Sequence, residues 1–138
     1  MELHFVHTYP DGSLGAVVGI FFDRELGGDH ENFFVEQMLP VFESHENHSK
    51  VINTPMFVSS FLRSLDTNDF WHYDGSLTTP PCTEGIKWTL LKSVQPISAR
   101  QLKYFNDMWK DNHDFAEGRG NNREVQPLNG RKIYYKMP

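Results

Sequence analysis

Two polar side chains near the start of the chain have the spacing of a metal ligand and its supporting carboxylate. Glu2 and His4 lie two residues apart, so on a β-strand both project from the same face. A carboxylate in that position can accept the free ring N–H of a metal-bound histidine, which fixes the tautomer and raises the basicity of the ring. The simpler interpretation is a strand with two polar residues facing solvent, because one histidine does not make a zinc site. His7 projects from the opposite face and so cannot be a second ligand beside His4.

A second motif joins two threonines to two prolines. Thr78 and Thr79 precede Pro80 and Pro81 within residues 75–82 (GSLTTPPC). Because proline fixes φ, this turn is rigid and holds the two hydroxyls in defined positions. A fixed hydroxyl can accept a hydrogen bond from a metal-bound nucleophile and orient it toward a substrate. The alternative is an ordinary loop that follows a strand.

Strands must position both motifs. Residues 2–7 alternate polar and apolar faces, and residues 16–22 (AVVGIFF) form a continuous apolar run of strand length. Residues 10–12 (PDG) between them predict a turn, so the two strands are neighbours or a hairpin. The sequence predicts five strands in all, at residues 2–7, 16–22, 70–73, 86–91 and 133–135.

Two helices are predicted beside these strands. The first lies within residues 32–43, where Pro40 indicates a helix that is short, kinked or ends early. The second begins at a capping box, Ser98–Gln101 (SARQ). Residues 44–69 are polar and irregular between them. Three apolar residues of that segment are expected to anchor it to the core: Phe57, Phe61 and Leu62.

Composition narrows the class of protein. The 138 residues amount to one domain, and 38% hydrophobic with 14% aromatic content favours a sheet over a helical bundle. The net charge of −5 and the scattered basic residues predict no nucleic-acid partner, and no segment has the apolar length of a membrane span. Cys82 is the only cysteine, so an internal disulfide is excluded, and on this ground alone either a reducing compartment or a cut disulfide framework is favoured.

Several motifs, in the same order along the chain, resemble those of the α-class carbonic anhydrases. The matching segments are residues 2–7 (ELHFVH), 16–20 (AVVGI), 76–82 (SLTTPPC), Ile86 with Trp88, and 123–131 (REVQPLNGR). The resemblance covers nearly all of residues 1–138 and corresponds to about the C-terminal half of the family domain. It implies a mainly β (α+β) fold with a large twisted, mostly antiparallel sheet and short peripheral helices, of which this chain would form a part.

The resemblance also implies roles for individual residues in the reversible hydration of carbon dioxide to bicarbonate. His4 would be one of three zinc-binding histidines, and Glu2 would be its carboxylate partner. Thr78 would orient the zinc-bound hydroxide, and Thr79 would contact bicarbonate. The apolar wall that receives carbon dioxide would consist of Val6, Val17, Leu77, Ile86 and Trp88. Tyr73 would lie in the hydrogen-bond network behind the site.

In the family, a His-x-His strand upstream of the His4 motif supplies the other two zinc ligands, and these 138 residues contain no such motif ahead of Glu2. The resemblance therefore implies that zinc binds only if another segment or chain supplies those ligands, and that this chain alone is inactive. Another protein chain is expected to cover the exposed edge of the sheet. The context of Cys82 resembles secreted, lumenal or periplasmic members, in which the cysteine at this position is disulfide-bonded.

Two functional hypotheses follow from these observations. In the first, the chain is part of a zinc-dependent carbonic anhydrase whose remaining ligands come from elsewhere. In the second, it is a catalytically inactive carbonic anhydrase-like subunit with a structural or binding role in a larger assembly. A shortened gene model or splice product without a biological role is a third interpretation. The zinc content of the assembled protein distinguishes the first two.

Overall fold

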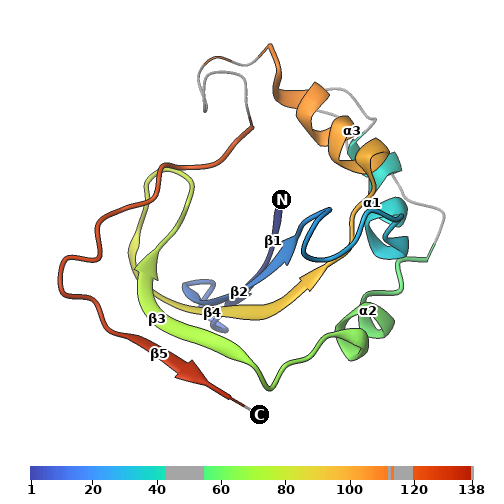
Figure 1. Cartoon of the computed structure of the whole chain (residues 1–138). Helices are drawn as coiled ribbons and strands as arrows, with labels where there is room; N and C mark the ends of the chain where they lie inside the picture. The colour runs from blue at the N-terminus through green and yellow to red at the C-terminus, as the bar shows by residue number, and fades with distance from the viewer. Residues whose placement is uncertain (43–54, 112, 114–119, 138) are drawn as a thin grey trace.

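The computed structural model describes residues 1–42, 55–111, 113 and 120–137, and these residues form one five-stranded sheet with three short helices (Figure 1). The strands are β1 (Glu2–Thr8), β2 (Leu14–Phe22), β3 (Phe70–Ser76), β4 (Glu84–Gln95) and β5 (Ile133–Lys136). The helices are α1 (Phe33–Phe42), α2 (Val58–Ser64) and α3 (Ala99–Trp109). No helix in these described ranges is long and apolar enough to cross a membrane.

The sheet is mixed, with strand order β1-β2-β4-β3-β5. Three of the neighbouring pairs are antiparallel, and β2 with β4 is parallel. The prediction of a mostly antiparallel sheet is therefore confirmed. Hairpin β1–β2 closes as predicted at the PDG turn, where Tyr9 N–H donates to Ser13 O at 2.8 Å and Asp11 Oδ1 accepts from Ser13 N–H at 2.9 Å. The parallel pair arises because β2 and β4 are joined by a long crossover that includes α1, α2 and β3.

The two faces of the sheet pack differently. One face carries the main core, which joins the sheet to the three helices. Its buried members are Ile20, Phe22, Phe34, Val35, Met38, Leu39, Phe61, Leu65, Leu91 and Ile97. The opposite face carries a separate small cluster of Val17, Ile86 and Trp88. Alternation along each strand produces this division, since Val17 and Ile20 of β2 point to opposite sides.

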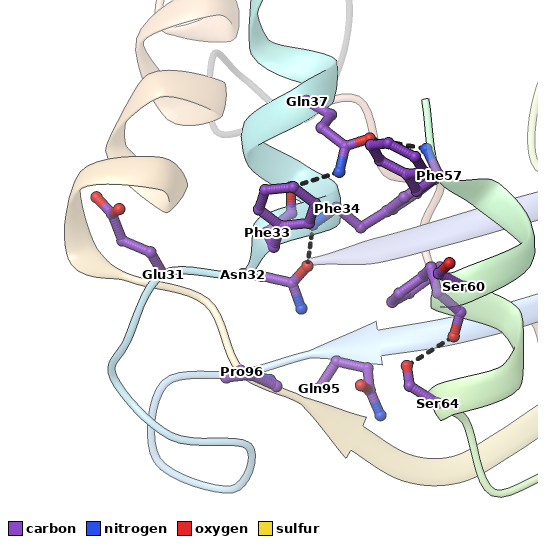
Figure 2. Close-up of a pocket in the computed structure, with 11 residues that line it drawn as sticks. Glu31, Asn32, Phe33, Phe34, Gln37, Phe57, Ser60, Ser64, Gln95 and Pro96 are labelled. Atoms are coloured by element: carbon purple, nitrogen blue, oxygen red, sulfur yellow. Dashed lines mark hydrogen bonds between the residues drawn. The ribbon is translucent and has the colours of Figure 1, made fainter. Parts of the chain in front are cut away.

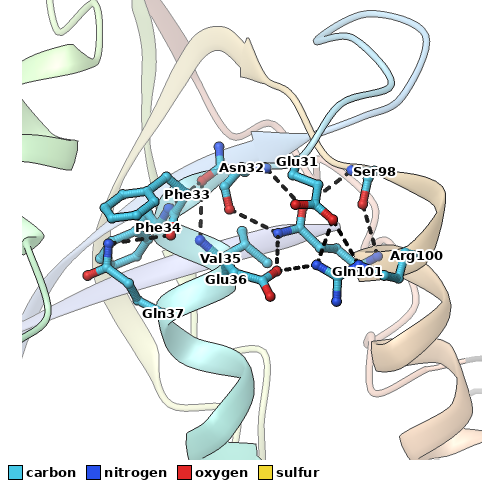
Figure 3. Close-up of polar contacts among 10 residues, drawn as sticks. All are labelled: Glu31, Asn32, Phe33, Phe34, Val35, Glu36, Gln37, Ser98, Arg100 and Gln101. Atoms are coloured by element: carbon cyan, nitrogen blue, oxygen red, sulfur yellow. Dashed lines mark hydrogen bonds and ion pairs between the residues drawn. The ribbon is translucent and has the colours of Figure 1, made fainter. Parts of the chain in front are cut away.

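A buried polar network joins the N-termini of α1 and α3 (Figure 3). The predicted capping box is present, because Ser98 Oγ accepts from the Gln101 backbone N–H at 3.2 Å and the Gln101 side chain accepts from Ser98 N–H at 3.4 Å. The fully buried Gln101 amide also exchanges two hydrogen bonds with the backbone of Asn32, at 3.0 and 2.9 Å. Asn32 in turn caps α1 by accepting from Phe34 N–H and Val35 N–H. Helix α1 continues through Pro40 and ends two residues later.

Helix α2 was not predicted from the sequence. Of the three expected anchors, Phe61 is buried and stacks on Phe34 with ring centroids 4.2 Å apart. The predictions for Phe57 and Leu62 were wrong, because these side chains are 50% and 42% exposed. Only one of the seven residues of α2 is buried, so the helix lacks the repeated apolar spacing by which a helix is recognised in a sequence. Its stability comes from packing against Phe34 and not from a local pattern. Part of the predicted irregular segment, residues 44–54, lies outside the described residues.

Candidate functional site

Strand β1 places Glu2 and His4 together on the face that carries the small cluster. Glu2 Oε1 lies 3.0 Å from His4 Nε2. This ring nitrogen is shielded from solvent, yet the contact lacks the geometry of a well-formed hydrogen bond, so the nitrogen has no hydrogen-bond partner within the described residues. Because Nε2 faces the carboxylate, the tautomer with the proton on Nε2 is favoured, and the lone pair on Nδ1 remains for a ligand.

Gly19 leaves space that the Glu2 carboxylate enters. It is the register partner of His4 on β2. A Cβ atom at this position would lie 2.7 Å from Glu2 Oε1 and 2.5 Å from a terminal methyl carbon of Leu90. Sequence reasoning missed this role, although a glycine inside an apolar strand is itself a signal that another group approaches the backbone closely.

Trp88 connects the histidine to the apolar cluster. Its ring meets the His4 ring edge-on, with centroids 4.8 Å apart and an interplanar angle of 79°. On another side it stacks against Tyr73, with centroids 6.3 Å apart. Val17, Ile86 and Trp88 are each at most 3% exposed, and three partly buried side chains pack against them: Tyr73, Leu77 and Leu90. The structure thus brings five of the six predicted pocket residues together.

Val6 is the predicted pocket residue that lies apart. It pairs with Val17 in the register of β1 and β2, but its side chain is 52% exposed and it is not part of the cluster. In the described residues, β1 is at the edge of the sheet and pairs only with β2, so nothing covers Val6 from the far side.

The electrostatic environment of the cluster is shaped by burial and by the Glu2 carboxylate. Burial raises the pKa of the Tyr73 phenol above its usual value, and the nearby negative charge of Glu2 raises it further. The Arg131 guanidinium acts in the opposite direction. Tyr73 is therefore held in its neutral form, as a hydroxyl that can donate a hydrogen bond.

The threonine loop, residues 77–83, joins β3 to β4. Its base is closed by a hydrogen bond from Leu77 N–H to Thr83 O at 2.9 Å, and Cys82 N–H donates to Thr79 O at 2.8 Å. The Pro80–Pro81 bond is cis, and Cys82 has φ of 58°. Thr78 and Thr79 are exposed. In the described residues no hydrogen bond joins either hydroxyl to Glu2 or His4.

A metal ion would find one imidazole ligand at this site. The described residues contain no group of three or more His, Cys, Asp or Glu side chains that could hold a metal ion. The paired Glu2 and His4 fit one position of a metal site and do not make a complete one. His7 is exposed on the opposite face of β1 and does not add to it.

A separate open pocket of about 290 Å³ lies on the helical side of the sheet, between α1, α2 and the end of β4 (Figure 2). Its walls include Phe33 and Phe57, which stack loosely with centroids 6.5 Å apart, and the polar side chains of Gln37 and Gln95. None of the site residues predicted from the sequence lines this pocket. The predicted site residues Glu2, His4 and Trp88 lie on the other face of the sheet.

Comparison with known proteins identifies the class to which this fold and site belong. Residues 1–137 match the model of a family described as "Eukaryotic-type carbonic anhydrase". "Alpha carbonic anhydrase 4" of Arabidopsis thaliana is 36% identical over 138 residues, which is 100% of this chain and 47% of that protein. "Putative carbonic anhydrase 5" of Caenorhabditis elegans is 33% identical over 98% of this chain and 45% of its own length.

Solved structures agree with the sequence relatives. The carbonic anhydrase Cah3 of Chlamydomonas reinhardtii, in complex with acetazolamide, superposes with a TM-score of 0.78 at 31% identity, covering 99% of this chain and 56% of that one. Dioscorin, described in complex with ascorbate, gives a TM-score of 0.72 at 28% identity, covering 99% of this chain and 53% of that one. The chain belongs to the eukaryotic-type, or α-class, carbonic anhydrase family. It spans about half the length of the curated relatives that it matches.

Proposed function

We propose that this chain contributes one zinc ligand, the threonine loop and the apolar wall to a carbonic anhydrase site for the reversible hydration of carbon dioxide. Family membership and the names of the relatives support the reaction class. The observation that carries the proposal for this chain is the contact of Glu2 Oε1 with His4 Nε2 at 3.0 Å, on the face that holds the buried cluster of Val17 and Trp88.

The residues present fit zinc at a single ligand position. A shielded imidazole nitrogen directed at a carboxylate is the arrangement that orients a metal-bound histidine and leaves its other nitrogen for the metal. Zinc held by histidines lowers the pKa of bound water toward neutrality, a property for which carbonic anhydrases are the reference case. We propose that the remaining ligands come from a further polypeptide segment or chain, because the described residues do not contain a set of three.

The other residues would prepare the site for carbon dioxide. Glu2 holds the tautomer of His4, and the edge-on ring of Trp88 restricts the rotation of the imidazole. Val17 and Ile86 offer an apolar surface suited to a small ligand without charge. The Thr78 hydroxyl would accept a hydrogen bond from the nucleophile and so set its direction, while Thr79 would bind the anionic product.

Zinc content tests this proposal. We would measure zinc per chain by elemental analysis in material purified from its native source together with everything that copurifies. About one zinc per chain, lost in His4→Ala and retained in His7→Ala, is the expected result. His7→Ala is the matched control, because it removes a histidine from the same strand on the opposite face. Zinc that survives His4→Ala, or no zinc above background, would overturn the proposal.

A binding or structural subunit is the second candidate function. The lack of a three-residue metal group within the described ranges favours it. Dioscorin, a solved structure of similar fold, is described in complex with ascorbate, which supports a role for this fold in binding a ligand other than carbon dioxide. In this case the assembled protein contains no stoichiometric zinc, and His4→Ala leaves its composition and partners unchanged.

A further inference from the structure

A single arginine ties the C-terminal arm to the threonine loop. The arm, residues 120–132, follows α3 in the described chain and passes beside the loop that joins β3 to β4 (Figure 1). Residues 121–130 are exposed apart from Arg123, which is partly buried. Its Nη1 donates to Ser76 Oγ at 3.0 Å and to Leu77 O at 3.4 Å. Within residues 121–130, the one partly buried residue, Arg123, is therefore also the residue that contacts the loop.

The two residues that Arg123 holds are also fixed from the other side. Trp88 Nε1–H donates to Ser76 O at 2.9 Å, and Ser76 Oγ–H donates to Leu77 O at 3.1 Å. Leu77 N–H closes the base of the loop by donating to Thr83 O. Residues 76–77, which immediately precede Thr78, are thus held by Trp88 of the buried cluster and by the Arg123 guanidinium.

Arg123 forms no ion pair with a carboxylate among the described residues. Both of its acceptors are neutral oxygens at the base of the loop. Hydrogen bonds from a charged donor are stronger than those between neutral groups. An arginine that makes two of them to consecutive residues restricts the backbone there more than a neutral side chain does.

We propose that Arg123 is the positioning residue of the threonine loop, which fixes Ser76 and Leu77 and thereby the direction of the Thr78 hydroxyl. The importance of that direction for catalysis rests on the proposed function, whereas the effect on the loop does not. Sequence reasoning placed Arg123 in a C-terminal motif without a role. Nothing in the motif itself indicates that residues 47 positions apart meet.

The thiol of Cys82 provides a readout of the loop that needs neither zinc nor activity. It is the single cysteine of the chain and lies within the loop, unpaired. We would follow its reaction with a chromogenic aromatic disulfide, and amide hydrogen exchange of Leu77 and Cys82, in the full chain. Arg123→Gln is expected to accelerate both by about tenfold, the factor set by one charge-assisted hydrogen bond in an opening equilibrium.

Controls separate positioning of the loop from general stability. Exchange of the Val18 and Ile20 amides in β2 should change less than about twofold, because these residues are in the sheet and make no contact with the arm. Arg123→Lys keeps the charge but loses the planar fork, so it should restore the slow rates only in part. Arg63→Gln, which removes an exposed arginine on α2, should leave the loop unchanged.

Loop rates within about twofold of the wild type in a folded Arg123→Gln variant would overturn the inference. If that variant does not fold, Arg123→Lys decides, because it keeps the charge and loses the planar fork that reaches both acceptors. Faster loop exchange then supports the inference, and unchanged exchange refutes it. In assembled protein with hydratase activity, Arg123→Gln should lower kcat by about tenfold at unchanged zinc content. If the assembled protein has no such activity, the proposed function fails while the loop measurements still decide the role of Arg123.

Discussion

Replacing Gly19 by alanine tests whether the contact of Glu2 with His4 depends on the empty position opposite the histidine. The added Cβ would lie 2.7 Å from Glu2 Oε1 and 2.5 Å from a Leu90 methyl carbon. Both are terminal atoms of side chains, so they can rotate away and the backbone need not move. The carboxylate is therefore expected to leave the imidazole in the Gly19→Ala variant.

The energetic cost follows from these two displacements. Forcing a side chain out of its preferred rotamer costs about 0.5–1.5 kcal/mol, so two such changes cost about 1–3 kcal/mol. Alanine offsets about 0.4–1 kcal/mol of this by reducing the conformational freedom of the unfolded chain. We expect a net destabilisation of about 1–2 kcal/mol, with the larger part due to Leu90, which packs against the buried cluster.

Urea unfolding of a double-mutant cycle provides the assay. With a slope of about 1–3 kcal/mol per molar urea, Gly19→Ala should lower the unfolding midpoint by roughly 0.3–2 M. In a Glu2→Ala background one of the two displacements is absent, so the cost of Gly19→Ala should fall by about 0.5–1.5 kcal/mol. Gly15→Ala is the matched control on the same strand, because its Cβ would meet only the exposed ring of Tyr9.

Equal costs of Gly19→Ala in the two backgrounds would refute the reasoning, since the carboxylate would then not occupy the space opposite the histidine. A stabilised Gly19→Ala protein would refute it as well. If Gly15→Ala also changes its cost with Glu2→Ala, the coupling is a general property of the hairpin and not of this contact.

Three further predictions follow from the same contacts. Glu2→Ala in zinc-loaded assembled protein should weaken zinc binding by about 10–100-fold in competition with a chelator, and unchanged affinity would contradict the role of Glu2. Gln101→Leu leaves the backbone N–H groups of Asn32 and Ser98 without their acceptor, while Asn32 O keeps its hydrogen bond from Glu36 N–H, and should cost about 2–4 kcal/mol in urea unfolding; a loss below about 1 kcal/mol would contradict this. Because the pKa of Tyr73 is raised in the folded state, its stabilising effect is complete below about pH 10 and is lost as the pH rises through that raised pKa. Between about pH 9 and 12, the unfolding free energy of the wild type should therefore fall more steeply than that of Tyr73→Phe, and parallel curves would contradict the pKa shift.

The sequence predicted the elements that have a strong local signal. The apolar run of β2, the PDG turn and the capping box at Ser98 each depend on neighbours within a few residues, and each was confirmed. The predicted strands at residues 70–73 and 86–91 were too short, because the observed strands extend to Ser76 and to Gln95. The polar residues at these ends belong to a strand only because a paired neighbour satisfies their backbone groups.

The parts of the site that the sequence did not predict are those made by contacts between distant segments. The approach of Glu2 to Gly19 requires the register of two strands, and the clamp of Arg123 on Ser76 joins positions 47 residues apart. The two-residue spacing of Glu2 and His4, by contrast, predicts their shared face directly, as the structure has it. A Val6 side chain facing solvent also depends on what lies beside the edge strand, which no local pattern specifies.

The arrangement of the sheet indicates why the proposed site lies on one face. The helices and the main core occupy the face of Ile20 and Leu91, so that face is closed by the chain itself. Among the residues that the structure describes, the opposite face holds a cluster of three buried residues, with His4 at its border and β1 at the edge of the sheet. A strand placed beside β1 would bring its side chains within about 4.5–5.5 Å of those on the same face of β1. The edge beside β1 is therefore where a further segment could add ligands to His4 and cover Val6, and zinc binding and exposure of Val6 should change together when that segment is present.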